Sequence, residues 1–173
     1  MHIQTPRMLI RKFHPDDAAD LYEIFGDAKT MENCEPPYDL TKTKDFLTSF
    51  CIARQGALAA VHKDSGKLIG YILFNEYEKD VYEIGWIFNR NYWRQGYAYE
   101  SCKAVIDHAF AVLNAHKIFA EATDAIKSVS LMKKLGMQPE GIQRSQTKDN
   151  HGNWADLYFY GLLQSDWMQS IAS

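Results

Sequence analysis

The feature that most constrains the fold is a strand that runs through a short turn into a long helix, over residues 82–110. The turn reads Trp93-Arg94-Gln95-Gly96-Tyr97-Ala98. The first N–H groups of a helix have no partner within it, and they lie at the positive end of the helix dipole, so they favour an anion such as a pyrophosphate. Exposed helix starts usually carry Asp or Glu, but this helix has no acidic residue before Glu100. The segment therefore predicts an anion site.

The length and charge of the chain limit the classes of protein that it can represent. Its 173 residues fit a single domain, which we expect to span residues 1–173. A net charge of −3 argues against binding nucleic acid through bulk electrostatics. No apolar run is long enough to cross a bilayer, and the first eight residues lack the apolar stretch of a signal peptide. We expect neither a nucleic-acid partner nor a membrane partner.

The cysteines and histidines predict no disulfide framework and no metal site. Cys34, Cys51 and Cys102 are an odd, scattered set without a CxxC pair, which is typical of reduced thiols in a cytoplasmic protein. The six histidines form neither an HExxH motif nor a pair four residues apart. We therefore expect no metal.

Periodicity and turn residues predict the order β-α-α-β-β-β-α-β-α-β-β. The predicted strands are 8–13, 57–63, 68–77, 81–89, 117–123, 137–144 and 154–163, and the predicted helices are 15–25, 41–51, 96–114 and 128–135. Thr41 or Thr43 is a candidate cap for the second helix, and Ser128 for the last. Strands first run together and then alternate with helices, which indicates a mixed α/β fold with part of the sheet parallel.

Four stretches in this order resemble one known family. They are Thr5-Pro6-Arg7-Met8-Leu9-Ile10-Arg11 with Pro15-Asp16-Asp17, Glu83-Ile84-Gly85-Trp86-Ile87, Tyr92 through Glu100, and Ser128 through Met137 with Glu140-Gly141; Asp156 and Trp167 extend the match. Together they resemble the GNAT superfamily of acetyl-CoA-dependent N-acetyltransferases. The likeness is greatest to the branch that contains ribosomal-protein N-terminal (alanine) acetyltransferases.

The resemblance implies a mostly antiparallel central sheet with a parallel part, flanked by helices. It also implies acetyl-CoA as co-substrate and direct attack of an amine on the thioester. The residues that it places at the cofactor are Ile87, Phe88, Arg94, Gln95, Gly96, Tyr97, Ala98, Asp124 and Ser128. The family usually has Asn three residues before the serine, where this chain has Ala125, so Asp124 is the candidate to replace the contact that this Asn makes to the pantetheine arm.

Glu83 is the candidate general base, because members of the superfamily place a carboxylate on the strand before the turn. Burial would raise the pKa of such a carboxyl group toward the working pH. The competing interpretation is a solvent-facing glutamate on a strand. Glu76, at the end of the preceding strand, and Glu35, in a Pro-rich loop, are alternative bases.

Ser128 is the second candidate catalytic residue, as the group that protonates the leaving thiolate. The competing and compatible interpretation is that its hydroxyl caps the helix.

We therefore expect an enzyme that transfers acetyl to a primary amine, with a protein N-terminal amine as the first candidate acceptor. A small amine such as a polyamine, amino acid or antibiotic is the alternative acceptor, and a non-catalytic acyl-CoA-binding sensor is the alternative class. The expected state is a monomer or a homodimer.

Overall fold

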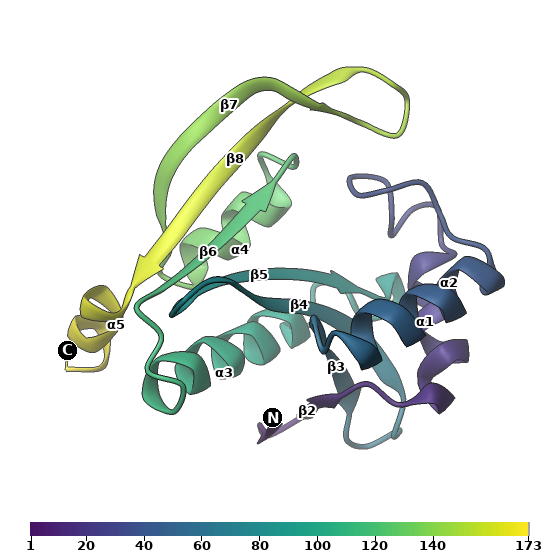
Figure 1. Cartoon of the computed structure of the whole chain (residues 1–173), viewed down its shortest axis with the longest axis horizontal. Coiled ribbons are helices and arrows are strands. Elements are labelled where there is room, and N and C mark those ends of the chain that lie inside the picture. Colours follow the sequence, from purple (N-terminus) through teal and green to yellow (C-terminus); the bar gives the residue numbers. More distant parts are fainter. Residues whose placement is uncertain (173) are drawn as a thin grey trace.

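The computed structural model describes residues 1–172, and its centre is one eight-stranded sheet (Figure 1). The strands are β1 (His2–Gln4), β2 (Met8–Lys12), β3 (Ala57–His62), β4 (Leu68–Glu78), β5 (Val81–Phe88), β6 (Lys117–Ala122), β7 (Gln138–Lys148) and β8 (Trp154–Leu163). Their order across the sheet is β1-β2-β3-β4-β5-β6-β8-β7. Only the β5–β6 pair is parallel in this sheet of the described residues.

Helices cover both faces of the sheet. They are α1 (Ala18–Phe25), α2 (Leu40–Phe46), α3 (Tyr97–Ala111), α4 (Lys127–Lys134) and α5 (Gln164–Ile171). Two 3-10 turns, Pro15–Asp17 and Arg90–Tyr92, and a π-helical segment, Leu47–Ala53, complete the helical structure. One apolar cluster joins α3 and α4 to the sheet, and a second joins α1 and the π-helical segment to the opposite face.

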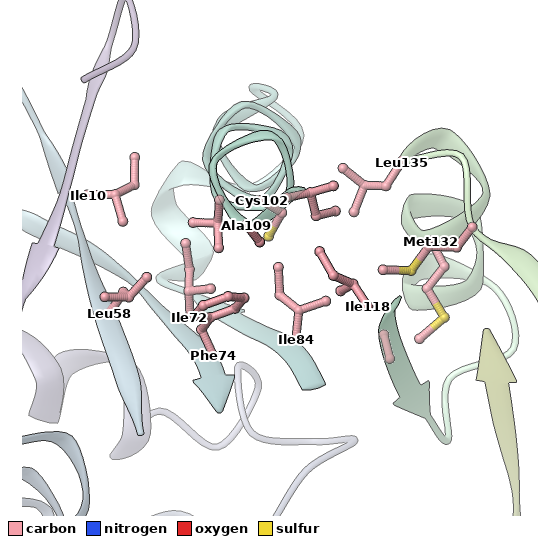
Figure 2. Close-up of a cluster of buried hydrophobic side chains, with 14 of the residues drawn as sticks. Ile10, Leu58, Ile72, Phe74, Ile84, Cys102, Ala109, Ile118, Met132 and Leu135 are labelled. Carbon is pink, nitrogen blue, oxygen red and sulfur yellow. The ribbon is translucent and has the colours of Figure 1, made fainter. Parts of the chain in front are cut away.

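The larger core lies between α3 and the middle strands. Cys102 and Ala109 of α3 are fully buried and point at Ile84 of β5 and Ile118 of β6 (Figure 2). These small side chains let the helix approach the sheet closely, and large aliphatic residues fill the other side of the contact. The packing fixes the start of α3 relative to the end of β5.

The mixed sheet with a parallel part, predicted from the sequence, is confirmed, while several details differ. Asp39 caps α2, since its carboxylate accepts the N–H of Lys42 at 2.7 Å, so neither Thr41 nor Thr43 is the cap. The long helix ends at Ala111 rather than near residue 114. β1 and α5 were not predicted. A three-residue strand carries no measurable alternation, and α5 is held through Trp167, whose indole N–H donates to Asp107 at 2.7 Å.

None of the helices in the described residues is long and apolar enough to cross a membrane.

Candidate active site

The sheet opens into a wedge between β5 and β6. Residues 81–83 of β5 pair with residues 117–119 of β6, and the pairing stops at Glu83 and Phe119. β5 continues to Phe88 and β6 to Ala122, and Figure 1 shows the two strands diverging. β4 occupies the other edge of β5 along its whole length. The edge of residues 84–88 that faces the wedge is therefore unpaired by any described strand, and its backbone groups are free to bind a ligand, except the Phe88 carbonyl, which accepts a side-chain hydrogen bond.

A tight turn at the end of β5 leads into α3. The indole N–H of Trp93 donates to the carbonyl of Phe88 at 2.7 Å, which folds the chain back on itself. Arg94 and Gly96 then adopt left-handed backbone conformations, with φ of 60° and 86°. Such alternation turns successive N–H groups toward one side, which is the geometry of an anion-binding backbone nest.

The N–H groups at this turn are free. Within residues 1–172, no acceptor is found for the backbone N–H of Gln95, Gly96, Tyr97 or Ala98. The Arg94 side chain is exposed and likewise has no partner in the described part of the chain. A 15-residue helix follows these donors, so the positive end of its dipole adds to the attraction for an anion.

Two lysines of α4 border the same turn. The ammonium of Lys127 lies 5.4 Å from the centre of the Trp93 ring, and that of Lys134 lies 4.8 Å from the centre of the Tyr99 ring. The two ammonium groups add positive charge on the α4 side of the wedge opening, the part of the wedge that lies next to the turn. The start of α3 is positive as well, because of its helix dipole.

Glu83 is the last β5 residue that pairs with β6, so it lies where the wedge begins. Its side chain is half-buried. Burial, and then the neighbouring Glu121 carboxylate, raise the pKa of Glu83 above its ordinary value. A raised carboxyl pKa brings the group closer to the range in which it accepts a proton during turnover.

The alternative bases lie in different places. Glu76 follows Phe74 by two residues on β4 and so shares its face, where the Phe74 and Tyr82 rings stack at 4.9 Å. Glu83 alternates with Tyr82 and lies on the opposite face. Glu35 is on the Glu83 side of the sheet, where its carboxylate accepts the Tyr38 hydroxyl at 2.6 Å.

An aromatic pocket of about 200 Å³ opens on the same face as Glu83. It is lined by Phe25, Met31, Cys34, Glu35, Tyr38, Phe46, Phe50, Tyr71 and Ile87. Ile87 and Glu83 are four residues apart on β5, which is about 13 Å along a strand. Gly85 lies between them and carries no side chain, and the Leu73 side chain of β4 lies beside it, with its Cδ2 3.5 Å from where a Cβ of residue 85 would be.

The tip of the β7–β8 hairpin borders this pocket. The amide N–H₂ of Asn150 donates to the carbonyl of Met31 at 2.8 Å and to that of Glu35 at 3.2 Å. Residues 27–39 are thus held at two places. The N–H of Tyr38 donates to the carbonyl of Phe25 at the end of α1, and the hairpin tip binds Met31 and Glu35. This contact crosses the wedge on the side away from α3.

The prediction that Ser128 caps α4 is wrong. The helix begins at Lys127, and the carboxylate of Asp124 accepts the N–H groups of Ile126 and Lys127 at 2.8 and 2.9 Å. An aspartate two or three residues ahead of the donors reaches them better than a serine inside the first turn. The Ser128 hydroxyl is half-buried and has no hydrogen-bond partner within the described residues, so it is available to a ligand.

Comparisons with known proteins identify the family of the chain. Residues 7–138 match the family model described as an acetyltransferase (GNAT) domain. The chain belongs to the GNAT acetyltransferase family. It is similar to a Bacillus subtilis (strain 168) protein named uncharacterized N-acetyltransferase YnaD, with 35% identity over 171 residues that cover 96% of this chain and 99% of the relative.

Two solved structures share the fold of this GNAT protein. The GNAT-family acetyltransferase from Bacillus anthracis has a TM-score of 0.88 and 28% identity, covering 95% of this chain and 99% of that one. The ribosomal-protein-S5-alanine acetyltransferase from Vibrio fischeri has a TM-score of 0.80 and 20% identity, covering 96% and 98%. Together these findings make the protein an acetyl-CoA-dependent N-acetyltransferase.

Five of the nine candidate cofactor residues of this GNAT enzyme, all between the end of β5 and the first turn of α3, form two groups. Gln95, Gly96 and Ala98 lie together in the turn and offer backbone N–H groups. The side chains of Phe88 and Tyr97 are buried in the core, and Tyr97 places its hydroxyl 3.2 Å from Nε2 of His62, so these two residues face the wedge only through their backbone.

Sequence reasoning missed the rings of the aromatic pocket and the carboxylate of Glu121. Phe46 is the last residue of α2, and Phe50 lies in the π-helical segment. They stack at 5.1 Å, and ring contacts with Phe25 and Tyr71 join them across the pocket. No group of three or more metal-ligating side chains occurs in residues 1–172.

Proposed function

We propose that this GNAT enzyme transfers acetyl from acetyl-CoA to a primary amine by direct attack in a ternary complex, with Glu83 as the general base. The observation that carries the proposal is the position of Glu83. It lies at the apex of the wedge, with the free N–H groups of the turn toward one side and the aromatic pocket on its own face.

The pyrophosphate of acetyl-CoA binds the backbone N–H groups of residues 94–98 in this proposal. The pantetheine arm then runs into the wedge along the free edge of β5, where the Phe88 N–H lies. The backbone of Ile87 pairs with Tyr71 of β4, so Ile87 contributes its side chain instead. Asp124 keeps one carboxylate oxygen for the start of α4 and has its other oxygen available at the same mouth. In this proposal the arm hydrogen-bonds to the unpaired edge of β5 as an added strand would.

The chemistry needs three proton transfers. Glu83 takes a proton from the acceptor ammonium, and the free amine attacks the thioester carbonyl. The nitrogen of the tetrahedral intermediate then gives up its second proton as the C–S bond breaks and the thiolate of CoA leaves. Ser128 lies at the start of α4 with an unengaged hydroxyl, which passes its proton to the thiolate and regains one from that nitrogen through solvent. The raised pKa of Glu83 suits a base that must hold the proton during the reaction.

The acceptor is the N-terminal amine of a protein whose first side chain is apolar. The support is the pocket: five aromatic rings line it, and Glu35 is the carboxylate at its lining. A first side chain fits such a pocket while the amine reaches toward Glu83 past Gly85. A polyamine would need carboxylates for its further ammonium groups, but Glu35 already accepts the Tyr38 hydroxyl at 2.6 Å and lies 3.7 Å from the Lys42 ammonium. A small amine with one apolar group remains the alternative acceptor.

The test combines binding and turnover. Titration calorimetry measures acetyl-CoA affinity, and thiol release is followed with short peptides that begin with Ala, Leu or Phe, with free amino acids and with spermidine. We expect saturable release that is fastest with the apolar peptides. Binding without thiol release on every amine would instead indicate an acyl-CoA sensor and overturn the proposal.

A pair of variants separates the acceptor pocket from general damage. Phe46→Ala should raise KM for the best peptide and leave KM for acetyl-CoA unchanged. The matched control is Tyr82→Ala, which removes a half-buried ring from the opposite face of the sheet. If both variants change the peptide KM equally, the pocket does not hold the acceptor.

A further inference from the structure

Arg7 reaches the cofactor turn from a distant part of the chain. It lies at the corner between β1 and β2, and its Nη1 donates to the carbonyl of Gln95 at 2.9 Å. Its guanidinium carbon lies 4.4 Å from the centre of the Tyr97 ring. A Cβ added at Gly96 would lie 3.3 Å from Nη2 of Arg7. The guanidinium therefore supports the back of the turn over three consecutive residues.

The same guanidinium neutralises the first acidic residue of α3. Nε and Nη2 of Arg7 both lie 2.6 Å from Oε2 of Glu100. The backbone N–H of Arg7 and the hydroxyl of Thr5 donate to Oε1 at 2.9 and 2.5 Å. Burial acts to raise the pKa of Glu100, but these hydrogen bonds outweigh it and lower the pKa, so the carboxylate stays ionised beside a cation.

The bond to the Gln95 carbonyl also fixes a donor. A peptide bond is planar and trans, so its C=O and N–H point in opposite directions. When Arg7 holds the oxygen of Gln95 on its own side, the N–H of Gly96 must point to the opposite side, where the free donors of the turn lie. A flip of this peptide plane would replace that donor with a carbonyl oxygen, which repels an anion.

The corner that carries Arg7 is itself anchored. The N–H of Lys63, just after β3, donates to the Arg7 carbonyl at 3.0 Å, and the Lys63 ammonium donates to the Thr5 carbonyl at 2.6 Å. The corner is thus fixed to the sheet on one side and to α3 on the other.

We propose that Thr5, Arg7 and Glu100 form a clamp that sets the cofactor turn for anion binding, and that Arg7 is a positioning residue for acetyl-CoA. Arg7 binds the turn rather than the ligand. It orients the Gly96 N–H and cancels the charge that Glu100 would otherwise present to a phosphate. The inference rests on the proposed location of the pyrophosphate at this turn.

The test uses two acetyl donors that differ in the pyrophosphate. Arg7→Lys keeps the positive charge but loses the planar fork that binds Gln95 and Glu100 together. We expect it to weaken CoA binding roughly tenfold and to raise KM for acetyl-CoA by a similar factor, with little change in kcat. Acetyl-pantetheine has no pyrophosphate, so its kcat/KM should be the same in Arg7→Lys and the wild type.

The matched control is Arg11→Lys. Arg11 lies on β2 and makes a similar bidentate ion pair, with Asp17 at 2.8 Å to each oxygen, away from the turn. The Arg11→Lys variant should bind CoA with the affinity of the wild type. The clamp is refuted if Arg7→Lys binds CoA within about twofold of the wild type, or if it loses the same factor with acetyl-pantetheine.

A double variant keeps the test valid if Arg7→Lys folds poorly. Arg7→Met with Glu100→Gln removes both charges and leaves an apolar stem on Tyr97, but the Gln95 carbonyl still loses its donor. The selective loss of CoA binding should persist, and wild-type affinity would overturn the clamp. Gly96→Val tests the site itself: if Gly96→Val loses CoA and the clamp variants do not, the pyrophosphate site stands and only the clamp fails.

Discussion

A valine at position 96 should abolish most acetyl-CoA binding without unfolding the protein. Gly96 has φ of 86°, and forcing an L-residue into this region costs roughly 1–2 kcal/mol. The new Cβ would also lie 3.3 Å from Arg7, a contact that a flexible guanidinium can relieve. If the branched side chain shields one backbone donor from the pyrophosphate, one charge-assisted hydrogen bond is lost. The binding free energy then falls by about 1.5–3 kcal/mol, which raises Kd roughly 10- to 100-fold.

Gly136→Val is the control for backbone strain. Gly136 has φ of 88° at the end of α4, and an added Cβ would meet only Leu162 at 3.9 Å. Both variants should lose similar stability in urea unfolding, while calorimetry should detect the loss of acetyl-CoA binding only in Gly96→Val. Equal affinities in Gly96→Val and the wild type would refute the cofactor placement. A similar loss in both variants would show that strain alone is responsible.

Glu83→Gln should lower kcat by roughly 10²-fold or more without changing acetyl-CoA affinity, and should remove the acidic limb of the pH–rate profile. Since the Glu121 charge helps to raise the pKa of Glu83, Glu121→Gln should move that limb to lower pH. A carboxyl group with a raised folded-state pKa loses stabilising free energy as pH rises through that pKa, so Glu83→Gln should melt above the wild type at pH 7 and level with it below the ordinary value of 4.5. Asp124→Ala should cost about 1 kcal/mol of unfolding free energy, whereas Ser128→Ala should cost less than about 0.5 kcal/mol. If Ser128 protonates the thiolate, Ser128→Ala and Ser128→Gly should both turn over roughly 10²-fold more slowly; wild-type rates in both would leave solvent or a tyrosine as the donor.

Local signals in the sequence were enough to predict the cofactor turn and the strand that leads into it. A glycine between a β-type and a helical pattern predicts a left-handed position before a helix, and Gly96 occupies one. The same patterns placed Glu83 on the strand that enters this turn. These features depend on residues close together in the chain, where periodicity and turn chemistry are informative.

Contacts between distant residues could not be predicted in this way. Arg7 and Glu100 are 93 residues apart, and neither position differs locally from an ordinary surface charge. The choice of Asp39 over Thr41 as a cap, and of Asp124 over Ser128, depends on the angle at which each loop enters its helix. Several adjacent residues have suitable side chains, so composition alone did not separate them.

The two parts of the sheet, β1–β5 and β6–β8, are joined through three residue pairs between β5 and β6. A molecule that binds in the wedge beyond those pairs would connect β5 to β6 as a further length of strand would. Ligand binding and folding would therefore be thermodynamically linked. At 100 times its Kd, a ligand that binds only the native state adds about 2.7 kcal/mol to the free energy of unfolding. The lifetime of the protein against proteases would then follow the acetyl-CoA concentration of the cell, and the enzyme would persist when its donor is abundant.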